Sequence, residues 1–343
     1  MTTGTPPRHH EPRRRAPALT TDAERRRWRP NALEIVVIVG LVLLLGRAWL
    51  QELFAQPALQ TASTVFVAII LQATPFLVLG VLLSAAITAF VPASFWTRAL
   101  PSRPALAVPV AGVAGCLLPG CECASVPVAG SLMSKGVAPA ASLAFLLSAP
   151  AINPIVIVST LVAFPGQPMM AAARFAASLV TAVLMGWLWL RFGKSDWLRI
   201  SDRTHLHGDT RTHTFRLTAS HDFLHAGGFL VIGAMAAAVM NVAMPTSWMQ
   251  SIADHAIVSV IALALLAVVL SICSEADAFV AASFTSFSLT ARLAFLVVGP
   301  MVDLKLYALQ VGTFGRGFAA RFAPTTFAVA VIVSCITGWW LLS

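Results

Sequence analysis

Two related stretches of the chain decide its fold. The first is AFLLSAPAIN, Ala144–Asn153, and the second is AFLVVGPMVD, Ala294–Asp303. At an offset of 150 residues, their Ala, Phe, Leu and Pro positions are identical and an Asn aligns with an Asp. The same offset aligns Cys123 with Cys273, which is informative because the chain has five cysteines in all. The alternative is that apolar helices resemble one another by composition alone; we favour two related halves.

The composition is that of an integral membrane protein. The chain has 343 residues, of which 58% are hydrophobic and 11% charged, whereas soluble domains have roughly 25% charged residues. The formal net charge is +9, and residues 1–30 and 191–222 together supply +7 of it. Basic clusters beside apolar spans are typical of cytoplasmic loops. No nucleic-acid-binding motif accompanies them, so we predict no nucleic-acid partner.

The apolar segments predict an all-α polytopic fold, because no ten-residue alternation typical of a membrane barrel occurs. With the Arg-rich N-terminus in the cytoplasm, five segments in each half make the two halves inverted in topology. This parity depends on several short segments, which could instead be re-entrant hairpins. The predicted organisation is a disordered cytoplasmic tail (1–30), an N-terminal transmembrane helix (31–60), membrane repeat 1 (61–191), a cytoplasmic polar loop (192–220) and membrane repeat 2 (221–343).

Proline and glycine interrupt the apolar segments at three places. Proline removes a backbone donor and clashes with the preceding turn, and the polar groups it frees must be buried in protein or line a wet cavity. Inverted repeats with interrupted helices are typical of secondary transporters, whose substrates bind between the halves. The predicted breaks are Pro119 and Gly120, then Pro150 and Pro154, then Gly299 and Pro300.

Ionisable side chains occur in or beside the same apolar segments. A charge at the bilayer centre costs at least ~2.5 kcal/mol, so such residues are functional candidates. We expect Lys305 to pair with Asp303 or Glu275, with a purely structural ion pair as the alternative. Arg174 is expected to extend to the outer membrane interface. The predicted ion-coupling residues are Glu275, Asp277, Asp303 and Lys305.

Three thiols lie close together in sequence at Cys116, Cys121 and Cys123. Thiolates select soft metals and metalloids, so the Cys-Glu-Cys sequence is a candidate ligand for a soft solute. The spacing fits a structural zinc site poorly, and a Cys121–Cys123 disulfide would be strained. Taken alone, such cysteines are most often small buried hydrophobic residues.

Four motifs in order resemble the bacterial predicted-permease family that contains the organoarsenical efflux permeases. The resemblance covers about residues 62–342, and neither the Arg-rich tail nor the His-containing loop belongs to it. The matching residues are Gly120, Cys121, Cys123 and Pro127, then Pro150, Asn153 and Pro154, then Cys273, Ser274, Ala276 and Asp277, then Gly299, Pro300, Asp303 and Lys305.

The resemblance implies a secondary-carrier permease that exports a small soft or thiol-reactive solute, such as a trivalent organoarsenical, across the cytoplasmic membrane. The sequence has no phosphate-binding G-x-x-x-x-G-K-[ST] motif, so an ion gradient would drive transport. The residues expected to bind the substrate are Cys121, Glu122, Cys123, Asn153, Cys273 and Ser274.

Two alternatives remain open from the sequence. The segment RTHLHGDTRTHTFRLTASHDFLH, Arg203–His225, contains five histidines and would suit a zinc-like metal carrier, although a solvated loop is the simpler interpretation. Cys121 and Cys123 would suit a membrane-embedded thiol–disulfide enzyme or a partner scaffold. We predict no enzyme activity, no cofactor and no resident metal. The expected partners are a small solute, the lipid bilayer and a second copy of the chain or an accessory membrane protein.

Overall fold

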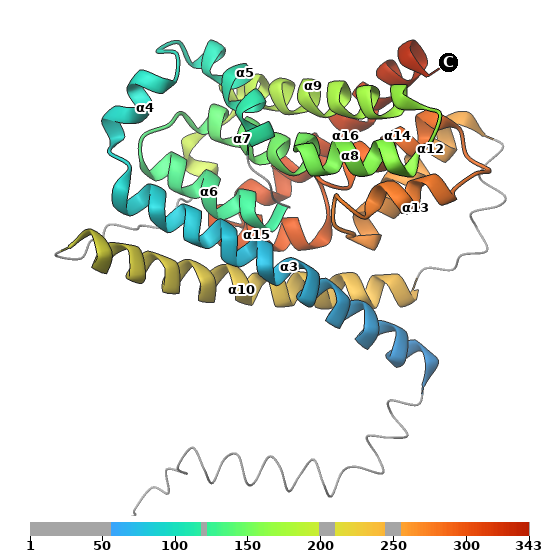
Figure 1. Ribbon diagram of the computed structural model, residues 1–343, viewed down its shortest axis with the longest axis horizontal. Helices are drawn as coiled ribbons and strands as arrows, with labels where there is room; N and C mark the ends of the chain where they lie inside the picture. The colour runs from blue at the N-terminus through green and yellow to red at the C-terminus, as the bar shows by residue number, and fades with distance from the viewer. Residues whose placement is uncertain (1–55, 118–121, 199–209, 244–254, 343) are drawn as a thin grey trace, which may run out of the picture. The chain divides into compact units, whose positions relative to one another are not determined.

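The computed structural model describes residues 56–117, 122–198, 210–243 and 255–342, and the regular structure in these ranges is helical (Figure 1). Short 3-10 turns lie at Gly115–Leu117 and Ser195–Trp197. The α-helices are α3 (Pro57–Phe90), α4 (Ala93–Ala99), α5 (Pro104–Ala114), α6 (Glu122–Ser134), α7 (Pro139–Ile152), α8 (Pro154–Ala163), α9 (Pro168–Phe192), α10 (Arg211–Ala243), α12 (Ala256–Leu270), α13 (Asp277–Ser283), α14 (Leu289–Val298), α15 (Leu304–Phe314) and α16 (Arg316–Leu341).

Five segments of the described chain are long and apolar enough to cross a membrane. They are α3, α9, α10, α16 and the consecutive pair α7 and α8, Pro139–Ala163. Shorter apolar helices lie at Pro104–Leu117, Ile257–Leu270 and Leu289–Val298. Because a bilayer crossing needs about 20 apolar residues, these short helices extend only part of the way. The protein is therefore an all-helical, multi-pass membrane protein.

Proline marks the beginning of many helices. A Pro occupies one of the first two positions of α3, α5, α7, α8 and α9. Its missing N–H costs nothing there, and its fixed φ angle suits a first helical turn. These prolines set where the helices start, so a chain of mostly apolar residues is divided into segments at defined positions.

The helices α3 and α10 lie side by side and run in opposite directions (Figure 1). The end of α3 meets the start of α10, where the Phe90 and Phe215 rings lie 6.0 Å apart. Further along, Ile69 of α3 packs in one cluster with Ala234 and Ala237 of α10. On its other side α3 contacts α6, where a Cβ on Gly80 would collide with the backbone of Ala124. Only glycine permits this close approach of the two helices.

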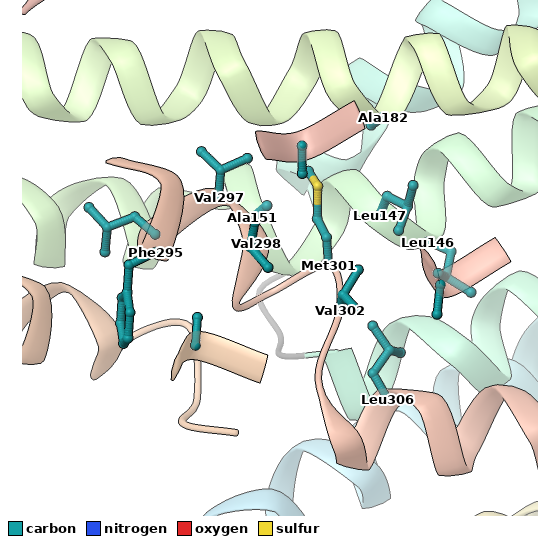
Figure 2. Packing of buried hydrophobic residues seen from close by; sticks show 14 of the residues in the cluster. Leu146, Leu147, Ala151, Ala182, Phe295, Val297, Val298, Met301, Val302 and Leu306 are labelled. Carbon is teal, nitrogen blue, oxygen red and sulfur yellow. The ribbon is translucent and has the colours of Figure 1, made fainter. Parts of the chain in front are cut away.

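The largest hydrophobic cluster joins the short helices to the long ones. The chain leaves helical conformation between α14 and α15, and Met301 and Val302 of that segment lie among buried side chains of α7 such as Leu147 and Ala151 (Figure 2). The apolar packing therefore encloses a stretch of non-helical backbone, as a membrane protein requires.

Some boundaries differ from the sequence prediction. Helix α10 begins at Arg211, so the last residues of the predicted polar loop are helical. Helix α7 continues through Pro150 and ends at Ile152, so Pro150 does not break the helix, whereas α8 begins at the predicted break Pro154. A proline in the last turn removes a single hydrogen bond, which that turn tolerates more easily than a helix interior does. The tail 1–30, most of the predicted helix 31–60, and the residues Pro119, Gly120 and Cys121 lie outside the described residues.

Candidate functional site

A buried ion pair joins α6 to α15. The Nζ of Lys305 lies 2.7 Å from Oε1 of Glu122, and both side chains are about 1% exposed. Glu122 is the first residue of α6, and Lys305 the second of α15. A Cβ on Gly233 of α10 would lie 2.7 Å from the Cα of Lys305, so α10 packs directly against this position. The expectation that Lys305 pairs with Asp303 or Glu275 missed its nearest partner, because Glu122 is 183 residues away in sequence.

Asp303 shares the same ammonium group more weakly and also caps α15. Its Oδ2 lies 3.4 Å from Nζ of Lys305, and its Oδ1 accepts a hydrogen bond of 2.5 Å from the backbone N–H of Leu306. Asn153 plays the same capping part at α8, where its Oδ1 accepts from the N–H of Val156 at 3.0 Å. Such caps satisfy an otherwise orphaned donor at a helix start.

A second buried ion pair joins α9 to α13. The guanidinium of Arg174 lies 2.8 Å from Oδ2 of Asp277 and donates to the Thr160 hydroxyl at 2.9 Å and to the Ser274 carbonyl at 3.1 Å. Arg174 is fully buried, so the expectation that it extends to the outer interface is wrong. The reason is that a carboxylate, a hydroxyl and a carbonyl surround it inside the protein, which removes the need for water.

The two ion pairs belong to one electrostatic cluster, to which Glu275 also belongs. Glu275 interacts with Glu122, Arg174 and Lys305, and Asp277 interacts with Glu122. The cluster therefore holds four carboxyl groups and two basic groups, Arg174 and Lys305. If every group is ionised, carboxylates exceed cations by two. A proton or a bound cation would reduce that excess.

Several polar atoms in the cluster have no hydrogen-bond partner among the described residues. They are Oε2 of Glu122, Oε1 of Glu275, Oδ1 of Asp277 and the hydroxyl of Ser274. Buried acceptors without partners are costly, so these atoms are the ones available to a solute, a water molecule or a proton. The hydroxyl of Ser274 is fully buried.

Two of the predicted thiols lie beside this cluster. Cys123 follows Glu122 at the start of α6, Cys273 precedes Ser274, and both are buried. Both interact electrostatically with the ammonium group of Lys305. Cys116 is half-buried in a 3-10 turn, and Cys335 of α16 packs against the hydrophobic core. Cys121 lies outside the described residues.

No group of three or more metal-binding side chains occurs within the described ranges. His213, His221 and His225 lie on α10, whereas His205 and His207 fall in a range that is not described. A cavity of about 270 Å³ lies away from the cluster, lined by apolar residues of α3 to α7 such as Leu83, Trp96 and Phe145. Its lining suits an acyl chain or an apolar group better than a charged solute.

Sequence reasoning missed the part played by Arg174 and Thr160. Arg174 occurs in the apolar run of α9. The free-energy cost of placing a charged side chain in a membrane could have indicated that it has a buried partner. Thr160 carried no signal, because a threonine in an apolar helix is common. A third missed residue is Asp222, grouped in sequence with the histidine-rich segment but 4% exposed on α10.

Comparison with known proteins agrees with this architecture. Residues 58–339 match a family described as predicted permease. The chain is 36% identical to the UPF0718 protein YcgR of Bacillus subtilis over 287 residues, which is 82% of this chain and 97% of that protein. It is 29% identical over 283 residues to a putative two-component membrane permease complex subunit of Streptococcus mutans, covering 80% of this chain and 94% of that protein. No solved structure matches significantly. The chain thus belongs to the predicted permease family.

Proposed function

We propose that this protein is a secondary carrier that moves a small soft or thiol-reactive solute across the cytoplasmic membrane. Membership of the permease family supports membrane transport in general. The observation that carries the finer proposal is the pair of buried ion pairs, Glu122–Lys305 and Arg174–Asp277. Each connects the N-terminal half of the chain to the C-terminal half across the helix breaks.

The proposal includes an inverted repeat of the two halves. Helices α7 and α14 begin 150 residues apart, at Pro139 and Leu289, and so do α8 and α15, at Pro154 and Leu304. Asn153 and Asp303 cap equivalent helices in the same way. The corresponding helices α3 and α10 run in opposite directions (Figure 1), as an inverted repeat requires.

In an inverted repeat, the contact of α6 with α15 is equivalent to the contact of α13 with α8. One ion pair lies at the first contact, and the second pair lies beside the other, where Arg174 also binds Thr160 of α8. We propose that these two contacts are the two gates of an alternating-access carrier. Separation of one pair opens the central site toward one side of the membrane while the other pair stays closed.

The buried thiols support a soft solute. Cys123 and Cys273 come from the two halves, and both lie in the electrostatic surroundings of Lys305. We propose that they bind the solute together with Cys121, Glu122, Asn153 and Ser274. A trivalent organoarsenical is a suitable substrate, because arsenic(III) is a soft centre of the kind that thiolates select.

Export coupled to an ion gradient is the direction that we propose. The excess of carboxyl groups in the cluster supports coupling, because Glu275, Asp277 or Asp303 can change protonation when a gate opens. In this scheme, Lys305 pairs alternately with the carboxylates of Glu122 and Asp303. The N-terminus is proposed to lie in the cytoplasm. A homo-oligomer or an accessory subunit remains a prediction, and one relative is named as a complex subunit.

Flux into everted membrane vesicles tests the proposal. Vesicles with the protein should accumulate trivalent methylarsenical when a proton gradient is imposed, and Cys123→Ala or Asp303→Asn should abolish the accumulation. Cys335→Ala is the matched control, because this thiol of α16 packs against the hydrophobic core and is not among the described groups that interact with Lys305. Zinc flux in place of arsenical flux would favour the metal carrier. Dithiol oxidation by the purified protein without any flux would favour the thiol–disulfide enzyme.

A further inference from the structure

A second polar cluster lies where α3, α6 and α10 meet, and the proposed transport cycle does not use it. The Ser84 hydroxyl donates to Oδ2 of Asp222 at 2.8 Å and lies 2.6 Å from the hydroxyl of Ser131. Thr88 Oγ1 lies 3.1 Å from the Ser131 hydroxyl. All four side chains are buried. We call these residues, Ser84, Thr88, Ser131 and Asp222, the hydroxyl site.

The oxygen atoms of the hydroxyl site lie within hydrogen-bond distance of their neighbours. The backbone carbonyl of Ser84 belongs to the group, since it lies 3.1 Å from the Ser131 hydroxyl and 3.0 Å from that of Thr88. Five oxygens from three helices therefore meet, and the bonded pairs among them lie 2.6 to 3.1 Å apart. Hydroxyl groups can rotate their hydrogens outward and present lone pairs to a cation.

A sixth oxygen lies one turn away on α10. Thr218 precedes Asp222 by four residues, which places both on the same face of the helix. The side chain of Thr218 is fully buried, and its Oγ1 has no hydrogen-bond partner among the described residues. A buried hydroxyl without a partner is uncommon, so within the described part of the chain the Thr218 oxygen is a free acceptor on the same helix face as Asp222.

Helix ends favour a positive charge at this site. Thr88 lies in the last turn of α3, which ends at Phe90, and Ser131 lies in the last turn of α6, which ends at Ser134. The C-terminal end of a helix carries a partial negative charge of about half a unit that stabilises cations. Two such ends and the carboxylate of Asp222 act together. The other oxygen of Asp222, Oδ1, faces outward, 3.4 Å from Nδ1 of the partly exposed His221.

We propose that the hydroxyl site binds a monovalent hard cation, namely Na⁺. Hard cations prefer oxygen ligands, and the site contributes a single carboxylate, which balances one positive charge but leaves a divalent ion undercompensated. The oxygens hydrogen-bond to one another at 2.6 to 3.1 Å, so they would have to move apart less for Na⁺ than for the larger K⁺. If the protein is the proposed carrier, the hydroxyl site would bind its coupling ion, and this role rests on the proposed function. Binding of Na⁺ to the site does not depend on transport.

Equilibrium binding of radioactive Na⁺ to the purified full-length protein tests this inference. Saturable binding is expected, with competition by Li⁺ and much weaker competition by K⁺. Asp222→Asn should abolish it, and Ser131→Ala should raise the dissociation constant by about tenfold, the effect of one lost ligand contact. Thr326→Val is the matched control, because this buried hydroxyl of α16 bonds only its own helix, at the Phe322 carbonyl.

Thermal unfolding gives a second measurement that needs no radioactive ion. Binding to the folded state alone raises the melting temperature with ligand concentration, so Na⁺ should stabilise the wild type and the Thr326→Val control. It should not stabilise Asp222→Asn, and Ser131→Ala should need about tenfold more Na⁺ for the same shift. Equal melting curves in Na⁺ and in choline for the wild type would overturn the inference. Such a result would leave arsenical flux untouched, and absence of flux with intact Na⁺ binding would refute only the carrier proposal.

Discussion

The two buried ion pairs differ in how the basic group is held. Arg174 has three partners, the Asp277 carboxylate, the Thr160 hydroxyl and the Ser274 carbonyl, at 2.8 to 3.1 Å. Lys305 is a compact charge between two carboxylates, at 2.7 Å from Glu122 and 3.4 Å from Asp303. A planar guanidinium fixes several acceptors at once, whereas an ammonium group moves readily between neighbours. The comparison suggests that the first pair is the more rigid contact and the second the more easily rearranged.

The largest expected effect is on the rigid pair. Arg174→Gln removes the cation and leaves Asp277 buried without compensation, which should lower the free energy of unfolding by about 3–5 kcal/mol. Chemical unfolding of the protein in detergent measures the loss. Arg191→Gln, near the exposed end of the same helix, is the control and should change little. Equal losses for the two variants would show that the ion pair does not stabilise the fold.

The second prediction concerns the partner of Lys305. Lys305→Met should remove transport, and adding Glu122→Gln should restore much of the lost unfolding free energy without restoring flux. Residues in contact show coupling energies of about 0.5–3 kcal/mol. The coupling of Lys305 with Glu122 should exceed its coupling with Asp303, because the first distance is shorter by several tenths of an ångström. Two double-mutant cycles measure both values, and the opposite order would contradict the assignment of Glu122 as the main partner.

The third prediction uses Asp303→Asn to separate the two parts that Asp303 plays, as the N-cap of α15 and as a charged partner of Lys305. Asn and Asp are about equally good N-caps, so the start of α15 should persist and the melting temperature should stay close to wild type. Transport should fall strongly, because the shared carboxylate is lost. Solute flux and unfolding measured on the same preparation test this, with Asp303→Ala as the comparison that loses both functions. Normal flux in Asp303→Asn would remove Asp303 from the coupling mechanism.

The smallest expected effect is at the equivalent cap in the other half. Asn153→Ala should lower the free energy of unfolding by about 0.5–2 kcal/mol through the loss of the α8 cap. Asn153→Asp should keep the cap and recover most of that loss. Unfolding in detergent distinguishes the two variants. If both lose stability equally, the hydrogen bond to Val156 is not what holds this helix start in place.

Local patterns predicted much of the helix framework. The apolar runs without barrel-like alternation predicted helical segments, and the described residues confirm this. The sequence predicted breaks at Pro154, Gly299 and Pro300, and these residues lie where α8 begins and directly after α14 ends. These features depend on residues that are neighbours along the chain. The start of α10 was missed, because its first turns are polar and resemble a loop.

The sequence by itself determined the class of protein, the helix breaks at Pro154 and at Gly299 and Pro300, and the list of costly intramembrane charges. Only the tertiary structure decided the partners: Glu122 for Lys305, Asp277 for Arg174, and the Ser84 hydroxyl of α3 for Asp222. The physical reason is that composition and spacing act locally, whereas an ion pair between residues 103 or 183 positions apart forms only after helices pack. The energy of burying a charge can be foreseen from its residue type, but the group that compensates it depends on which helices meet.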